Sequence, residues 1–191
     1  MSLREDVLDF HACDEEAVRG TVAALASRHG VRPDRRGASG EVPVGADHAD
    51  RGDRPALTDR DRRLVDRVRL LDTAPVGVTL CGPAYRDTPI VCANRTFLDI
   101  TGYSLEELRG RNPRLLQGSR TEPEAVAKLR EAVSIWEPVT VEVWNHRRDG
   151  TPFLNRVTLR PLQGDDGTVT HWGAVQAPVG GEHGPEGGAE P

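Results

Sequence analysis

The most nucleophilic side chains of this sequence are three cysteines, Cys13, Cys81 and Cys92. Their odd number and the lack of a C-x-x-C spacing predict neither a disulfide framework nor a zinc site. Cys81 and Cys92 stand in stretches with the composition of strands, where a buried cysteine usually packs as a small apolar side chain. The cysteines taken alone therefore indicate no metal centre and favour a packing role.

A second candidate for chemistry is the stretch Gly110–Gly118, which reads G-R-N-P-R-L-L-Q-G. It resembles the G-R-N-C-R-F-L-Q-G signature of the LOV class of PAS domains, the flavin-based blue-light receptors. Ala93–Ser104 resembles the A-N-x-x-F-x-x-x-T-G-Y-S segment of that family, and Asn145–Asn155 resembles its N-Y-R-K-D-G-x-x-F-W-N segment. Val175-Gln176 is similar to its terminal G-V-Q, so the resemblance extends over residues 76–179.

The resemblance implies a bound flavin, FMN, with FAD left open. Amide side chains suit such a ring because they donate and accept hydrogen bonds while staying neutral. By resemblance, Asn145 and Asn155 address the pyrimidine edge and Gln176 lies beside N5, while Val143 joins the apolar walls. The whole implied set of cofactor-binding residues is Cys81, Thr88, Asn94, Asn112, Pro113, Arg114, Leu116, Gln117, Arg130, Val133, Asn145, Asn155, Val157, Leu159 and Gln176.

Within that set, the resemblance gives Asn112 and Gln117 the ribityl chain and ring atoms of the flavin. Arg114 and Arg130 are expected to pair with its phosphate, where charge-assisted hydrogen bonds are strongest. The alternative for any one of these amides is a strand or turn residue that satisfies its own backbone. Seven such side chains in register favour the flavin site over that alternative.

Pro113 departs from the family signature, because the matching position carries the cysteine whose thiol adds to the excited flavin. Proline has no thiol and no backbone N–H, but it is tolerated in the first turn of a helix. We therefore expect flavin photoreduction to a semiquinone, with the electron coming from an external reductant or from a nearby aromatic side chain. The candidates are Trp136, Trp144, Trp172 and Tyr103. Gln176 is expected to switch its hydrogen bonds when N5 gains a proton.

Three functions remain in competition on the sequence alone. The first is a photosensory or redox-sensory flavoprotein without catalytic turnover, which signals through its flanking helices. The second is a degenerate PAS module that binds no flavin and acts only in protein–protein contact. The third is a small flavin-dependent enzyme, which we rank last because no acid–base pair or nicotinamide site stands out. The implied partners are the flavin, a second copy of the chain and an unidentified signalling protein.

The elements that would position these residues form an α+β domain over residues 73–179. Strands are predicted at Val76–Cys81 and Pro89–Ala93, followed by short helices at Asn94–Ile100, Ser104–Leu108 and Asn112–Gln117. A longer helix is predicted to begin with a capping box at Thr121-Glu122-Pro123-Glu124, with Val126, Leu129 and Val133 on its buried face. Three strands follow, around turns at Asp149-Gly150 and 164–167. The prediction is a five-stranded antiparallel PAS sheet with helices on one face.

The remainder of the chain is predicted to flank this domain. Residues 1–30 form an N-terminal helical segment, with a helix from Asp14 to His29 that ends at Gly30. Residues 31–56 have the composition of a flexible linker, and residues 180–191 that of a disordered tail. Residues 57–72 form an amphipathic helix capped by Thr58, whose apolar stripe packs on the domain or on a second copy. The stripe consists of Leu57, Leu64, Val68 and Leu71.

Composition places few further limits on function. The 191 residues carry a formal net charge of −5, which gives no electrostatic case for nucleic acid or a membrane surface as partner. No apolar run approaches the roughly 18 residues of a membrane span. The first residues have no apolar run after a basic start, so they do not resemble a signal peptide. We expect a cytoplasmic protein.

Overall fold

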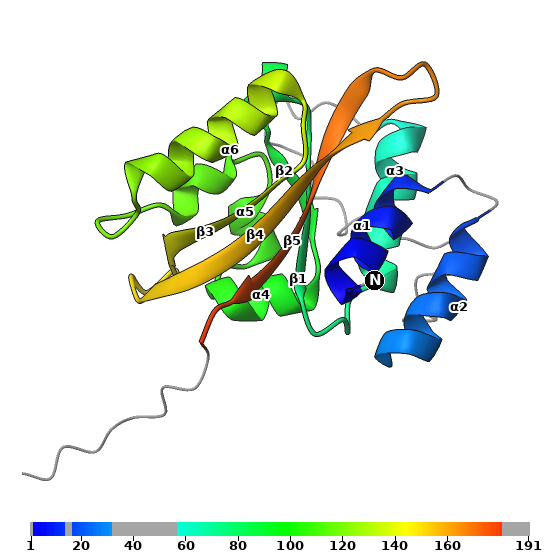
Figure 1. The fold of residues 1–191 in the computed structure, drawn as a ribbon, viewed down its shortest axis with the longest axis horizontal. Helices are drawn as coiled ribbons and strands as arrows, with labels where there is room; N and C mark the ends of the chain where they lie inside the picture. Colours follow the sequence, from blue (N-terminus) through cyan, green and yellow to red (C-terminus); the bar gives the residue numbers. More distant parts are fainter. Residues whose placement is uncertain (1, 14–16, 32–56, 181–191) are drawn as a thin grey trace, which may run out of the picture.

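The computed structural model describes residues 2–13, 17–31 and 57–180 of the chain. One antiparallel sheet of five strands, in the order β2-β1-β5-β4-β3, forms its centre (Figure 1). The strands are β1 (Gly77–Cys81), β2 (Ile90–Ala93), β3 (Val139–His146), β4 (Pro152–Gln163) and β5 (Val169–Pro178). The predicted linker and tail lie almost wholly outside the described residues, so those two predictions stay untested.

Alternation along the strands gives the sheet two different faces. On β3, Val141 and Val143 are buried while Glu142 between them is exposed, as the sequence predicted. The turn between β3 and β4 uses Gly150 at φ 88°, and the turn between β4 and β5 uses Gly167 at φ 79°. Glycine suits both places because a left-handed backbone carries no steric penalty there. The β3–β4 hairpin keeps a single register, whereas the β4–β5 register shifts between Leu162 and Gln163.

Short helices and α6 cover the inner face of the sheet. They are η2 (Ala84–Arg86), α4 (Arg95–Thr101), α5 (Leu105–Leu108), η3 (Pro113–Leu116) and α6 (Pro123–Ile135). Pro113 and Pro123 both stand in the first turn of their helices, where no intrahelical N–H is lost. These helices confirm the PAS order of elements.

The predicted capping box at the start of α6 is wrong. The N-cap residue is Glu122, with no side-chain cap. The Thr121 hydroxyl instead donates to the Trp144 carbonyl at 2.6 Å and accepts from the Gly118 N–H at 2.9 Å. Those bonds tie the loop before α6 to the edge strand β3. The expected buried face of α6 also differs, because Ala125 and Ala132 are its fully buried residues.

Three N-terminal helices lie on the outer side of the sheet, opposite α6 (Figure 1); the first and third contact the strands, and the second packs on the first. They are α1 (Leu3–Ala12), α2 (Val18–His29) and α3 (Asp59–Leu70). The helix α1 was not predicted, although its capping box is present in the sequence: the Glu5 carboxylate accepts from the Ser2 N–H at 2.7 Å. Gly30 ends α2 in a left-handed conformation, as predicted, and the expected cap Asp14 lies outside the described residues. The helices of the core domain therefore cover one face of the sheet, as predicted, and helices of the N-terminal extension cover the other.

The apolar stripe of α3 packs within the chain. Leu64, Val68 and Leu71 are at most 3% exposed and join the core of the outer face, whereas Leu57 is 37% exposed. Thr58 caps the helix, since its hydroxyl accepts from the Asp61 N–H at 3.1 Å. Of the two predicted uses of this stripe, packing on the domain is confirmed.

Candidate functional site

A cavity of ≈ 520 Å³ lies between the inner face of the sheet and the helices that cover it. This volume falls in the range of small-molecule and cofactor sites. Most of the predicted cofactor-binding residues line it, namely Cys81, Thr88, Asn112, Pro113, Arg114, Leu116, Gln117, Arg130, Val133, Asn145, Val157, Leu159 and Gln176. The structure therefore brings together residues that are up to 95 positions apart in the sequence (176 − 81).

Three amides from β3, β4 and β5 form a connected network at this cavity. Asn155 donates from Nδ2 to Asn145 Oδ1 at 2.9 Å and to Gln176 Oε1 at 2.8 Å. Gln176 in turn donates from Nε2 to the Thr79 hydroxyl at 3.2 Å. Asn155 does not line the cavity, but its Oδ1 is buried and has no hydrogen-bond partner among the described residues. A buried acceptor without a partner is costly, which fits a site completed by a polar ligand.

Apolar and charged groups form the remainder of the lining. Val126, Leu129 and Val133 present one side of α6 to the cavity and are half-buried because they border open space. Arg130, on the same helix, also lines it. Arg114 lines it too and forms an ion pair with Asp87, whose backbone carbonyl also accepts from Asn112 Nδ2 at 2.6 Å. Two arginines at one cavity suit an anionic group such as a phosphate.

The structure does not bring Asn94, one of the predicted cofactor-binding residues, to the cavity. Asn94 is fully buried and lies outside the cavity lining. Its Oδ1 accepts from the N–H groups of Phe97 and Val78, and its Nδ2 donates to the carbonyls of Leu71 and Val76. These four bonds use the amide completely while they cap α4 and join it to the segment after α3. Asn94 is a structural residue of the fold.

The structure shows which of the two strand cysteines, Cys81 or Cys92, lies at the cavity. Cys81 lines the cavity, and burial raises the pKa of its thiol to about 12. Cys92 belongs to the core of the outer face instead. Pro113 lines the cavity at the first position of η3. Among the described residues, Cys81 is therefore the one cysteine that a molecule in the cavity could contact, and its thiol stays protonated.

Of the four candidate electron donors, two line the cavity and two do not. Trp172 and Trp136 line the cavity, Trp172 at 1% exposure and Trp136 at 55%. Trp144 alternates away from the lining residue Val143 and lies under the Arg120 guanidinium, 4.7 Å from its carbon to the ring centroid. Tyr103 is packed in the cluster around α4 and α5 and does not line the cavity. Trp172 and Trp136 are therefore the two candidates that a molecule in the cavity could contact.

Sequence reasoning missed several lining residues. They are Thr79, Ala84, Tyr85, Asp87, Val126, Leu129, Ser134, Val169 and Ala174, together with Trp136 and Trp172, which were considered only as electron donors. Thr79 on β1 and Trp172 and Ala174 on β5 follow the two-residue alternation from Cys81 and Gln176, so that spacing was an available signal, whereas Val169 lies beyond the register shift between β4 and β5 and does not follow it. Tyr85 and Asp87 belong to the turn around η2, and no local pattern placed that turn at the cavity.

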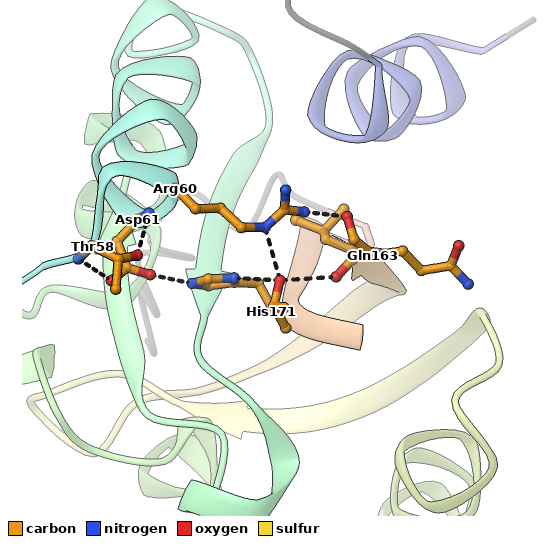
Figure 2. Close-up of polar contacts among 7 residues, drawn as sticks. Thr58, Arg60, Asp61, Gln163 and His171 are labelled. Atoms are coloured by element: carbon orange, nitrogen blue, oxygen red, sulfur yellow. Dashed lines mark hydrogen bonds and ion pairs between the residues drawn. The ribbon is translucent and has the colours of Figure 1, made fainter. Parts of the chain in front are cut away.

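The opposite face of β5 carries a polar network that fastens α3 to the sheet (Figure 2). His171 Nε2 lies 2.6 Å from Asp61 Oδ1, and His171 Nδ1 lies 3.0 Å from the Thr170 hydroxyl. Arg60 donates from Nε to that hydroxyl at 2.9 Å and from Nη2 to the Gln163 carbonyl. We call His171, Asp61, Thr170 and Arg60 the α3 clamp. It was not predicted from the sequence.

Protonation within the α3 clamp follows from burial. Burial lowers the pKa of His171 more than the Asp61 carboxylate raises it, so the imidazole is neutral near neutral pH. Burial also raises the pKa of Asp61, but the hydrogen bonds from Thr58 and His171 outweigh that effect and the net pKa is lowered. The neutral imidazole therefore donates from Nε2–H to an ionised Asp61. Trp172, the next residue along β5, faces the cavity, so one strand joins the clamp to the site.

Comparison with known proteins agrees with this architecture. The model of the PAS domain family matches residues 75–176. Blue-light-activated histidine kinase 1 of Erythrobacter litoralis is 42% identical over 123 residues, which cover 62% of this chain and 34% of that protein. A blue-light photoreceptor of Listeria monocytogenes is 38% identical over 116 residues, covering 61% of this chain and 46% of that protein. The chain thus spans less than half the length of both relatives.

A solved structure shares the fold at useful sequence identity. The light-state LOV structure of the blue-light photoreceptor Aureochrome1 is 38% identical, with a TM-score of 0.54, and the match covers 60% of this chain and 89% of that one. No helix among the described residues is both long and apolar enough to cross a membrane. From its family match and from the LOV fold around its cavity, this chain belongs to the PAS domain family and is of the LOV type.

Proposed function

We propose that this chain is a flavin-binding sensory module that responds to blue light or to redox state, without catalytic turnover. The observation that carries the proposal is the amide network of Asn145, Asn155 and Gln176 at the 520 Å³ cavity, with Asn155 Oδ1 left unpaired. The similarity to a blue-light-activated histidine kinase and to a blue-light photoreceptor supports the same proposal. Input by light, a cytoplasmic location and the lack of turnover are all part of the proposal.

FMN is the flavin we propose, because the polar groups fall at two separate places on the lining. The amides of Asn145 and Gln176 would hold the pyrimidine edge and N5, while Val157 and Leu159 supply an apolar wall. Arg130 and Arg114 would hold the phosphate, with Arg114 exchanging Asp87 for it. When bound, the flavin would supply absorption of blue light and the capacity to accept one electron. FAD would need its adenine to lie outside this cavity.

We further propose that the photochemistry is electron transfer, not thiol addition. Pro113 contributes a saturated ring to the lining where the signature of the family carries a thiol. Cys81 is the alternative nucleophile, since it lines the same cavity. Its pKa of about 12 keeps the thiol protonated, and Cys81 is paired with Trp172 of β5 and, past a register shift, with Ile90 of β2. Attack on a ring carbon would require the thiol to reach bonding distance with correct alignment, which a residue inside a paired strand does poorly.

Gln176 is the residue we propose to report the change. In the structure its Oε1 accepts from Asn155 and its Nε2 donates to Thr79, so the amide has one preferred orientation. If flavin N5 gained a proton, it would become a hydrogen-bond donor. Gln176 would then have to present its Oε1, an acceptor, where its Nε2 donor now points. Rotation of the amide would break the bond to Asn155 on β4 and reverse the bond to Thr79 on β1, whose hydroxyl can donate as well as accept, and would disturb β5. The α3 clamp on the other face of β5 gives that disturbance a route to the flanking helices.

Dimerisation through those helices is a further part of the proposal. The apolar stripe of α3 is already buried within the chain, so a second copy would have to contact other surfaces of α1–α3. Sedimentation of the flavin-loaded chain in the dark and under illumination tests this. A purely monomeric chain in both conditions contradicts it. The downstream partner is not identified by any contact in the structure.

The photochemical test compares the wild-type chain with Cys81→Ala and Pro113→Cys, each loaded with FMN and illuminated with blue light. We expect wild type and Cys81→Ala to be reduced alike in the presence of a thiol reductant, because no adduct forms. Pro113→Cys should gain a bleaching that reverses in the dark without oxygen, because it places a thiol in the lining. Reversible bleaching of the wild type that is lost in Cys81→Ala would overturn electron transfer in favour of a Cys81 adduct.

The signalling test uses Gln176→Leu. This variant should still be photoreduced but should lose the difference between light and dark X-ray scattering. An unchanged scattering difference in Gln176→Leu contradicts the proposed role of this amide. Gln117→Leu serves as a control, because Gln117 also lines the cavity but does not belong to the network on the sheet.

A further inference from the structure

The indole of Trp172 forms part of the wall of the cavity. Trp172 lies on β5 with Cys81 of β1 as its cross-strand neighbour, and both side chains line the cavity. It is among the largest fully buried side chains of the described residues, at 1% exposure. A molecule that fills the cavity would therefore contact this ring with no solvent layer between them. Electron transfer slows steeply with distance, so contact favours Trp172 over Trp144 and Tyr103, which lie outside the lining.

The nitrogen of this indole has an unusual environment. Trp172 Nε1 is buried and has no hydrogen-bond partner among the described residues. A buried indole usually finds an acceptor for its N–H, because leaving the donor unpaired costs free energy. Oxidation of an indole makes its N–H strongly acidic, and an acceptor next to it would take that proton. No described side chain or backbone group is placed to do so at Nε1.

We propose that Trp172 is the immediate electron donor to the photoexcited flavin, and that its oxidised indole keeps its proton. This inference rests on the proposed function, since it requires a flavin in the cavity. Trp172 loses one electron and becomes a radical cation with the Nε1–H bond intact, and the flavin gains that electron. The electron either returns to Trp172 or stays on the flavin when a thiol reductant in solution reduces Trp172 again. In the second case each electron comes from one thiol group, which releases its proton to water and becomes a thiyl radical, and two such radicals couple to one disulfide.

The retained proton has a functional consequence. A radical cation that cannot lose its proton remains a strong oxidant, so return of the electron is rapid. Without a reductant the reduced state is then short-lived, and with one it accumulates. Trp172 would thereby make the lifetime of the reduced state depend on the reductant outside the protein. That behaviour makes a single site sensitive to light and redox state together.

The test is transient absorption of the FMN-loaded chain after a blue flash, after FMN uptake has been measured for each variant. Trp172→Phe should lose most of the rapid electron transfer and gain flavin fluorescence. Trp144→Phe is the control and should keep the rapid transfer, because Trp144 lies outside the lining. In the wild type, the spectrum of the protonated indole radical should appear and decay without conversion to the deprotonated form.

Two results overturn the inference: rapid transfer that persists in Trp172→Phe, or a deprotonated indole radical in the wild type. If Trp172→Phe does not fold, fluorotryptophan incorporated into the Trp136→Phe/Trp144→Phe double variant provides the second test. It keeps the shape of the ring at position 172 and should slow the transfer, and an unchanged rate counts against the inference. A wild-type chain that takes up no FMN contradicts the proposed function and this inference with it, which separates that failure from the other two.

Discussion

Replacing Asp61 by alanine tests the α3 clamp most sharply. The carboxylate receives the His171 Nε2–H at 2.6 Å, and the two side chains are 18% and 7% exposed. Alanine leaves that N–H buried without an acceptor, a loss that typically costs about 1–3 kcal/mol. We expect the free energy of unfolding to fall by about 2 kcal/mol, since water cannot easily replace the carboxylate at so buried a nitrogen. For a chain of this size, that corresponds to a fall in melting temperature of roughly 4–8 °C.

The matched control is Asp59→Ala, in the same helical turn. Asp59 pairs with Arg62 at 2.8 Å, but both side chains are more than half exposed. An exposed pair of this kind contributes about 0.2–1 kcal/mol. Chemical denaturation of both variants, together with His171→Phe and the double variant Asp61→Ala/His171→Phe, gives the coupling energy of the clamp. The double variant should lose less stability than the sum of its two single changes.

Equal losses in Asp61→Ala and Asp59→Ala would refute this reasoning, because burial of the acceptor would then make no difference. Additive losses in the double variant would refute it as well, because they would show that Asp61 and His171 do not act as a pair. Circular dichroism at a single wavelength suffices for the melting curves, provided that they are reversible.

Three further predictions concern stability and pH. The pKa of His171 is lowered in the folded chain from its ordinary 6.5, so the unfolded chain binds more protons below that pH. The free energy of unfolding should therefore decline as pH falls below 6.5, less steeply in His171→Phe, and parallel pH curves would contradict this. Asn94→Ala should cost about 3 kcal/mol from a lost cap and unpaired buried groups, yet leave the affinity for FMN unchanged in urea titrations run beside binding assays. Trp136→Gly should raise the free energy of unfolding by about 0.5–1 kcal/mol, and the melting temperature with it, through relief of a left-handed residue at φ 58°, while Trp136→Ala should not.

The alternation of apolar and polar residues along the strands, with the turn glycines, predicted most of the fold. Alternating valines at 139, 141 and 143 set the inner face of β3, and the glycines of both hairpin turns set the connections. Local chemistry also gave the cap at Thr58, since its hydroxyl accepts from the Asp61 N–H three residues on. These signals lie within a few residues of one another and need no knowledge of tertiary contacts.

The predictions failed where a side chain that fits a local sequence pattern forms its hydrogen bonds with residues far away in the sequence. Thr121 has the sequence of a cap, but its hydroxyl is used by the Trp144 carbonyl, 23 positions away. Asn94 fits a pattern of polar site residues, but the backbone of the segment after α3 uses its amide. The helix α1 was overlooked because Asp6 and Asp9 interrupt its apolar face. In the structure these acids contact His29 and Arg160, which the sequence places far away.

The candidate site also has features that the sequence could predict and features that only the structure shows. Its amides and arginines could be named by resemblance to a known family, because type and spacing are properties of the sequence. The sequence could not predict that Asn155 Oδ1 and Trp172 Nε1 lack hydrogen-bond partners among the described residues. That property depends on the position of every neighbouring donor and acceptor in the folded chain. Both atoms come from adjacent strands of the sheet, and both became apparent only with the structure.

The most direct test of the account is addition of FMN to the purified, flavin-free chain, followed by gel filtration and an absorption spectrum. The account predicts that one equivalent of FMN stays with the protein and shows the structured blue band of a buried flavin. Asn155→Leu, which removes the centre of the amide network, should weaken that binding, whereas Asn94→Ala should not. A folded wild-type chain that remains colourless and retains no FMN would contradict the central claim and leave a PAS module that acts through protein contacts alone.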